Sequence, residues 1–241
     1  MPTLEELTTE LISEHTTLDT TISALIENQS TLMLTQRAYC ISASETIKSI
    51  IDSYNNSIHL SIPLLTRKLI ETLAIAYDIH YNNNEKIHFL NAFISKHKSI
   101  KSYIILTNNK DKETLTRVGK IRSQIITRAR ELGLLDNYNR SRNGKILKYI
   151  NKKMPSVYSI FQRTHDEIPY TFYSSLSDDI HNNILSIERY HTRCIAEEYS
   201  LCRIPDDIDE HNIRLLLTTI DQTKNTQHLA TAILTGLANA E

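Results

Sequence analysis

One segment of the sequence, residues 62–80, is apolar on nearly every side of the helix that its composition predicts. A helix without a polar face must be covered by other elements, so this segment predicts a central helix. The chain has only 4 Gly and 5 Pro and no Trp, whereas sandwiches and barrels need many turn residues. We therefore expect an all-α protein, a bundle of about eight to ten helices.

Apolar periodicity and turn residues divide the rest of the chain into further helices. Near the N-terminus a leucine recurs at every seventh residue from Leu4 to Leu25, which predicts one apolar stripe beside an acidic face. Gly133 is a predicted C-terminal cap. The other expected helices cover residues 31–53, 85–106, 112–132, 145–152, 155–163 and 170–201, and a last one begins at about residue 205. The simplest organisation is a single domain over residues 1–241, with an N-terminal helical extension (1–56), a core (57–202) and a C-terminal helix (203–241).

Three charged residues interrupt the apolar central helix. Arg67, Glu71 and Asp78 share one face at helical spacing. A buried charge costs several kcal/mol unless it is paired and hydrogen-bonded. Two interpretations follow: an internal ion pair between Arg67 and Glu71 that packs against another helix, or a pocket that these side chains line.

A second polar face occurs in the serine-rich segment SSLSDDIHNNILSIERYH. Ser174, Ser177, Asp178, His181 and Glu188 fall close to one side of a helix. Ser177 precedes His181 by one turn and can position its imidazole, and a neighbouring Arg or carboxylate would bring the imidazole pKa near neutrality. His181 is therefore a candidate general acid or base; the alternative is a histidine that is only packed or solvated.

The pattern R-x-x-x-E at Arg67 and Glu71, followed by Y-x-x-L-S-x-x-x-H from Tyr173 to His181, resembles a bacterial helical family of unknown function. Genes of that family often lie near phage-defence genes. The family is distantly similar to the HEPN superfamily of RNA-cleaving and nucleotide-binding proteins. The resemblance spans roughly residues 57–186 and implies a HEPN-like core within residues 57–202, often dimeric, with an Arg and a His in one cleft.

The resemblance also implies roles for the site residues. His181, positioned by Ser177, would act as general acid or base on an RNA phosphodiester, Arg67 would stabilise phosphate charge, and Glu71 would orient Arg67. An Arg followed by four to six residues and then His, the catalytic HEPN pattern, does not occur; RIPDDIDEH has seven between them. The expected function is an RNA-directed effector, a metal-independent ribonuclease or toxin. The alternative is a non-catalytic interaction module or a regulatory subunit of a defence complex.

Residues 110–153 contain 13 Lys and Arg against 4 Asp and Glu, although the net charge of the chain is −1. Tyr138 and Tyr149 lie among these cations, and single-stranded RNA binds through such phosphate contacts and stacking rings. The alternative is a solvated face that pairs with the acidic N-terminal helix of the same chain or of a partner. The candidate RNA-binding residues are Lys120, Arg122, Arg128, Arg130, Arg140, Arg142, Lys145 and Lys148.

No metal or other cofactor is predicted. Two Glu-x-x-His pairs, Glu85 with His88 and Glu188 with His191, have the spacing of di-metal helical bundles, but the composition gives about as many by chance. The sequence lacks G-x-G-x-x-G and G-x-x-x-x-G-K-[ST], so the usual nucleotide-binding loops are not indicated. The three cysteines form no C-x-x-C and are expected to be reduced core residues.

Membrane association is not expected either. The sequence contains no run of about 18 apolar residues. Residues 1–36 carry six acidic residues and no Lys or Arg, unlike a basic signal or transit peptide. We therefore expect a cytoplasmic protein, with RNA or another protein as partner, that forms a homodimer.

Overall fold

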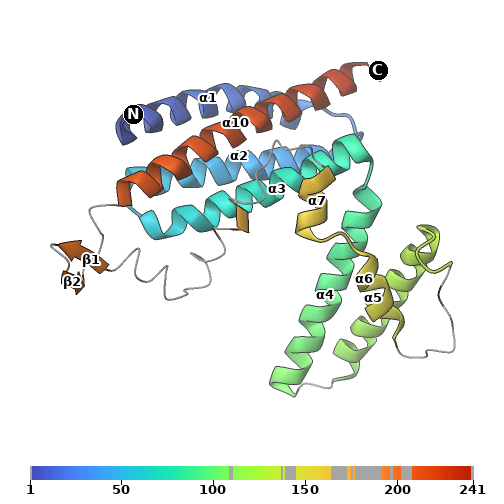
Figure 1. Cartoon of the computed structure of the whole chain (residues 1–241). Helices are drawn as coiled ribbons and strands as arrows, with labels where there is room; N and C mark the ends of the chain where they lie inside the picture. Colours follow the sequence, from blue (N-terminus) through green and yellow to red (C-terminus); the bar gives the residue numbers. More distant parts are fainter. Residues whose placement is uncertain are drawn as a thin grey trace. The chain divides into compact units, whose positions relative to one another are not determined.

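The computed structural model describes residues 2–108, 111–136, 138, 145–163, 173–174, 176, 192–195, 198–201 and 208–239. The chain forms two compact units (Figure 1): unit 1 consists of Met1–Tyr77 and Ile160–Glu241, and unit 2 of Asp78–Ser159. The two compact units do not show which segments fold independently. The single domain with an N-terminal extension (1–56), a core (57–202) and a C-terminal helix (203–241) therefore stays a prediction.

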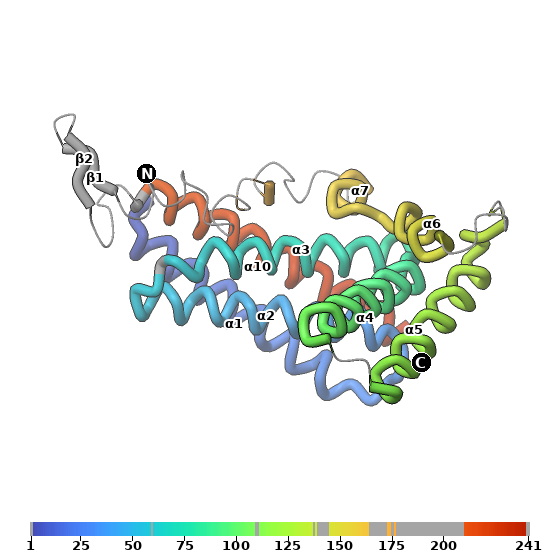
Figure 2. Tube along the Cα trace, turned by 90° about the horizontal axis from the view of Figure 1, so that it is seen from below, coloured from blue at the N-terminus to red at the C-terminus, as the bar shows by residue number. Residues whose placement is uncertain are grey.

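Unit 1 is built from long helices that lie side by side (Figures 1 and 2). α1 packs against α2 and α10, and α10 also packs against α2. The Tyr77 hydroxyl donates a hydrogen bond of 3.1 Å to the Asn225 carbonyl, which ties α3 to α10. The elements are α1 (Leu4–Glu27), α2 (Leu34–Asn55), the short 3-10 helix η1 (His59–Ser61), α3 (Ile62–Asn82) as far as Tyr77, α7 (Val157–Arg163) from Ile160, and α10 (Ile208–Ala238).

α1 has the predicted apolar stripe and the predicted acidic face. Thr3 and Glu6 form a capping box that satisfies backbone donors of the first turn. On the acidic face, Lys224 of α10 lies 3.0 Å from Glu10 and 3.6 Å from Glu14. The buried stripe of α1 consists of Leu7, Leu11, Leu18, Ile22 and Leu25.

Arg37, a buried arginine, caps the C-terminal end of α1. From α2, Arg37 donates to the carbonyl oxygen of Leu25 through Nε at 3.1 Å, and to the Asn28 and Ser30 carbonyls at 2.6 Å each. Carbonyl groups at a helix C-terminus lack intrahelical partners and carry partial negative charge. The guanidinium therefore satisfies these carbonyls, and they compensate for its burial.

α3 is the central helix that the sequence predicts. Its apolar side chains Ile62, Leu69, Ile70, Leu73 and Ala76 are completely buried. Each buried leucine or isoleucine side chain contributes about 1.5–3 kcal/mol to folding. This coverage explains why most of the segment is apolar.

Unit 2 packs three helices around an aliphatic core. α4 (Glu85–Thr107) packs against α5 (Lys112–Glu131), and α6 (Ile146–Lys153) packs against both. α5 ends as predicted at Gly133, whose φ of +67° places it in the left-handed region. The N–H of Gly133 bonds to the Arg130 carbonyl at 2.9 Å and that of Leu134 to the Ala129 carbonyl at 3.0 Å, which is a Schellman motif. The core comprises Leu90, Ile94, Ile121, Ile125, Ala129 and Ile150.

A short hairpin is the exception to the helical architecture. β1 (Thr192–Ile195) pairs antiparallel with β2 (Glu198–Leu201), with Thr192 opposite Leu201 and Ile195 opposite Glu198. The helix predicted over these residues is wrong, because β-branched Thr192 and Ile195 and aromatic Tyr199 favour an extended backbone. All other elements in the described ranges are helical, so the all-α fold is confirmed at that level. The total of eight to ten helices and the HEPN-like core stay predictions.

None of the helices in the described part of the chain is both long enough and apolar enough to cross a membrane.

Candidate functional site

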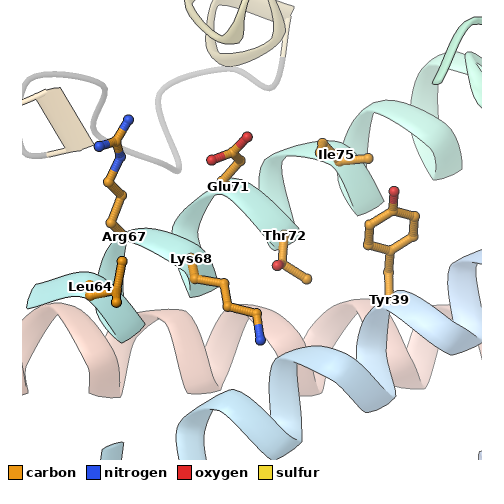
Figure 3. Close-up of a pocket in the computed structure, with 7 residues that line it drawn as sticks. All are labelled: Tyr39, Leu64, Arg67, Lys68, Glu71, Thr72 and Ile75. Carbon is orange, nitrogen blue, oxygen red and sulfur yellow. The ribbon is translucent and has the colours of Figure 1, made fainter. Parts of the chain in front are cut away.

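A cavity of about 330 Å³ opens between α2 and α3 in unit 1 (Figure 3). α3 supplies most of its wall through residues three, four and seven positions apart, which share one side of the helix. α2 supplies one aromatic ring. The lining residues are Tyr39, Leu64, Arg67, Lys68, Glu71, Thr72 and Ile75. The charged face of α3 therefore borders a cavity.

Arg67 and Glu71 are joined through the phenol of Tyr173. Arg67 Nη2 donates to the Tyr173 hydroxyl oxygen at 3.2 Å, and this hydroxyl donates to Glu71 Oε2 at 3.2 Å. The two charged side chains project from the same side of α3 (Figure 3). Among the described residues, the two charges form no direct ion pair within 4.0 Å. The interpretation as an internal Arg67–Glu71 ion pair is therefore replaced by a bridged arrangement.

The guanidinium of Arg67 keeps N–H donors with which it can bind a ligand. An arginine has five N–H donors in a planar fork, and the bond to Tyr173 uses one of them. Such a fork binds phosphate or carboxylate groups through paired hydrogen bonds. Exposed Lys68 adds a second cation to the wall, and Glu71 provides an acceptor for a ligand hydroxyl. The cavity is therefore suited to an anionic ligand that also carries hydroxyl groups.

Both phenols near the cavity stay protonated at neutral pH. Burial, together with the charge of Glu71, raises the pKa of Tyr39 above 10.0. Burial is also the largest cause that raises the pKa of Tyr173; the Glu71 carboxylate adds to it and the Arg67 guanidinium opposes it. A protonated Tyr173 can donate to Glu71 while it accepts from Arg67, which matches the observed bonds.

The catalytic candidates Ser177 and His181 lie outside the described residues. The first part of their motif is described: Tyr173 is 6% exposed and Leu176 is 1% exposed. The structure therefore brings Arg67, Glu71 and Tyr173 together, and the predicted approach of His181 to Arg67 stays a prediction.

Asp78, the third charge of the apolar helix, belongs to unit 2 and has no exposed surface. Its Oδ2 is 2.8 Å from His88 Nε2, and its Oδ1 accepts hydrogen bonds from the side-chain amides of Asn82 at 3.1 Å and Asn84 at 3.0 Å. A buried carboxylate is stabilised by such bonds. Asp78 therefore fixes the end of α3 against the start of α4 and has a structural role.

The predicted RNA-binding residues that the structure describes are all exposed. Phe93 lies under the Arg128 guanidinium, whose carbon is 4.7 Å from the ring centroid. Tyr138 and Tyr149, expected to stack on bases, pack on each other with centroids 5.1 Å apart. Arg140 and Arg142 lie outside the described residues. The exposed members are Lys120, Arg122, Arg128, Arg130, Lys145 and Lys148.

No group of three or more His, Cys, Asp or Glu side chains in the described ranges could hold a metal ion. His88, a member of one Glu-x-x-His pair, directs its Nε2 to Asp78. Of the cysteines, Cys40 is buried as expected, and burial raises the pKa of its thiol to about 12. The side chains of Cys194 and Cys202 lie outside the described residues.

Sequence reasoning did not select four polar residues that lie at this site. Lys68 and Thr72 are neighbours of the selected pair on α3, so the helical period would have found them. Tyr173 opens the quoted Y-x-x-L-S motif but had no assigned role. Tyr39 comes from α2, and no local pattern signals its approach to α3.

Comparison with known proteins gives a family but no characterised relative. No curated protein matches the chain, and no solved structure matches it. A family model, described as a family of unknown function (DUF5677), matches residues 37–198, from the first turn of α2 through α7 and the Tyr173 segment. The chain therefore belongs to the DUF5677 family.

Proposed function

We propose that this protein is an RNA-directed, HEPN-like effector of bacterial phage defence or of a toxin system, which acts in the cytoplasm as a homodimer. One observation carries the proposal: Tyr173 hydrogen-bonds to both Arg67 and Glu71. Tyr173 opens the Y-x-x-L-S-x-x-x-H motif, and the other two form R-x-x-x-E. The first residue of the second motif thus contacts both residues of the first, and this contact supports the proposal.

In the proposed mechanism Arg67 binds the scissile phosphate and stabilises the charge that develops on its oxygens. Glu71 and Tyr173 position the guanidinium. His181 removes the proton from the ribose 2′-hydroxyl as the 2′-oxygen–phosphorus bond forms and the bond to the 5′-oxygen breaks. The 5′-oxygen leaves with a proton taken from solvent water, and the protonated His181 returns its proton to solvent. The reaction needs no metal ion because Arg67 supplies the positive charge.

The exposed cations of unit 2 support the RNA part of the proposal. Lys120, Arg122, Lys145 and Lys148 are solvent-exposed. Phosphate contacts from such side chains bind single strands without sequence selectivity and weaken with salt. In the proposal they bind the RNA backbone through phosphate contacts of this kind.

Cleavage assays test this function. We expect purified protein to cleave total RNA or tRNA equally well with a divalent metal ion and with a chelator. Arg67→Ala and His181→Ala should each lower cleavage by about a hundredfold or more. Arg214→Ala is the matched control, because Arg214 is exposed on α10 of the same unit and forms a surface pair with Glu210. Thermal unfolding of each variant separates lost chemistry from lost fold.

A second candidate is the non-catalytic interaction module. Ile105 is 76% exposed and Leu106 is 84% exposed near the end of α4. Exposed aliphatic side chains of this kind favour contact with another protein. If the folded Arg67→Ala and His181→Ala variants keep full biological activity while Leu106→Glu loses it, the effector proposal is wrong and this candidate takes its place.

A further inference from the structure

Unit 2 contains a second pocket, of about 290 Å³, where α4, α5 and α6 meet. We propose that this pocket binds a phosphate monoester carried on a nucleoside, either a nucleoside monophosphate or the phosphorylated end of an RNA strand. The pocket uses neither Arg67 nor Glu71. The inference goes beyond the proposed function and does not depend on it.

The rim of the pocket is cationic. Lys98 and Lys101 of α4 and Lys148 of α6 line it, and no carboxylate does so among the described residues. Ammonium groups that line one pocket without a counter-charge repel one another, and an anion that binds there relieves the repulsion. The rim therefore favours a ligand with more than one negative charge, such as a phosphate monoester.

One of the three lysines is held in position by a neutral partner. Lys98 Nζ donates to Asn151 Oδ1 at 2.7 Å, so an α4 side chain reaches across to α6. An amide oxygen orients the ammonium group without neutralising its charge. Lys98 can therefore bind an anion with its two remaining N–H donors.

The floor of the pocket is apolar. Ile125 is completely buried, Ile94 is 5% exposed, and Leu147 is partly buried beside them. Small-molecule sites usually combine an apolar lining with a few polar groups that fix orientation. A floor of this kind suits the flat face of a base, while the ammonium groups at the rim bind the phosphate.

His97 also lines the pocket and is 7% exposed. Burial lowers its pKa below 6.5, and the positive charges of Lys101 and Arg122 lower it further. These two charges come from α4 and α5. Lys148 of α6 lines the same pocket. A phosphate in the pocket should reverse the effect, because its negative charge favours the imidazolium form. A rise in the pKa of His97 would therefore indicate that an anion has bound in the pocket.

Calorimetric titration of the full chain tests the inference. The probes are inorganic phosphate, a nucleoside, the matching nucleoside monophosphate, and a short RNA with either a 5′-phosphate or a 5′-hydroxyl. We expect the monophosphate to bind at least about tenfold more tightly than either of its parts. A stronger preference for the phosphorylated RNA would identify a strand end as the ligand.

Variants locate the site. Lys101→Ala and Lys148→Ala should each weaken binding of the monophosphate about tenfold, whereas Lys96→Ala should not. Lys96 is the matched control because it is exposed on the same helix and lies outside the pocket. The imidazole signals of His97 should shift, and its pKa should rise, as the ligand is added.

Three results would overturn the inference: a nucleoside monophosphate that binds no more tightly than the nucleoside or inorganic phosphate; equal losses of affinity in Lys96→Ala, Lys101→Ala and Lys148→Ala; or imidazole signals of His97 that do not change when the monophosphate is added. Equal affinity for the 5′-hydroxyl and 5′-phosphate RNA would identify the mononucleotide, and not a strand end, as the ligand. Absence of RNA cleavage would count against the proposed function and leave this site untouched.

Discussion

The guanidinium of Arg67 lies over the ring of Tyr173, with its central carbon 4.8 Å from the ring centroid. The two residues are 106 positions apart in the sequence. Their contact holds the Tyr173 segment against the charged face of α3, and so the bridge contributes to the fold of unit 1 as well as to the candidate site.

Tyr173→Phe should remove the bridge and keep the ring. The change deletes one donor and one acceptor between Arg67 and Glu71, so we expect the free energy of unfolding to fall by about 1 kcal/mol. Urea unfolding followed by circular dichroism measures this. Tyr103→Phe is the control, because Tyr103 is 53% exposed. Equal stability of both variants would show that the bridge contributes nothing.

Arg37→Met should destabilise unit 1 strongly. Methionine fills part of the space, but the carbonyls of Leu25, Asn28 and Ser30 lose their donors, and we expect a loss of about 2–4 kcal/mol. Lys48→Met makes the same charge change at an exposed position of α2 and should be close to neutral. Thermal unfolding compares the two variants. If Arg37→Met lowers the stability no more than Lys48→Met does, Arg37 does not stabilise the end of α1.

The stability of the protein should depend on His97 below pH 6.5. The pKa of His97 is lower in the folded state than its ordinary value of 6.5, so protonation favours the unfolded chain. The neutral ring contributes fully above about pH 6.5, and this contribution is lost as the pH falls below that value. Denaturant unfolding between about pH 8 and pH 5 should therefore show a weaker dependence on pH in His97→Gln than in the unmodified protein.

Gly133→Ala and Gly119→Ala should change stability in opposite directions. Gly133 has a φ of +67°, and an added Cβ would lie 3.0 Å from Asp136 Oδ2, so alanine should cost about 1–2 kcal/mol. Gly119 lies within α5, and nothing lies within 4 Å of an added Cβ, so alanine should stabilise the helix by up to about 1 kcal/mol. Chemical unfolding of both variants gives the two signs.

Cys40 should resist alkylation in the native protein. With a thiol pKa of about 12, roughly one molecule in ten thousand carries the reactive thiolate at pH 8. In a Cys194→Ser, Cys202→Ser variant, iodoacetamide should react about a thousandfold more slowly than with an ordinary thiol. Addition of denaturant should abolish the protection. Rapid labelling under native conditions would contradict the burial of Cys40.

The local sequence pattern was sufficient to predict most of the helices. Residues 62–80 and 112–132 were expected to be helical, and the helices extend over Ile62–Asn82 and Lys112–Glu131. Apolar period and stop signals such as Gly133 act within one or two turns, so a sequence window contains them. The helix predicted over Thr192–Leu201 is wrong, because this segment contains residues whose side chains favour strands.

The candidate site could be predicted only in part. The helical period placed Arg67 and Glu71 together, but the contact of both with Tyr173 joins segments about a hundred residues apart. The same period also grouped Asp78 with them, although His88, Asn82 and Asn84 satisfy its carboxylate in unit 2. Spacing along a helix defines a face, whereas the partners of that face depend on tertiary packing.

The packing of α1 against α10 has a consequence for biosynthesis. About 180 residues separate the end of α1 from the start of α10, which at 5–20 residues per second takes a ribosome roughly 10–35 seconds to add. Throughout that interval the leucine stripe of α1 lacks the helix that covers much of it. We therefore expect the nascent chain to need a chaperone during this interval, and messages truncated before α10 should yield aggregates rather than a smaller native protein.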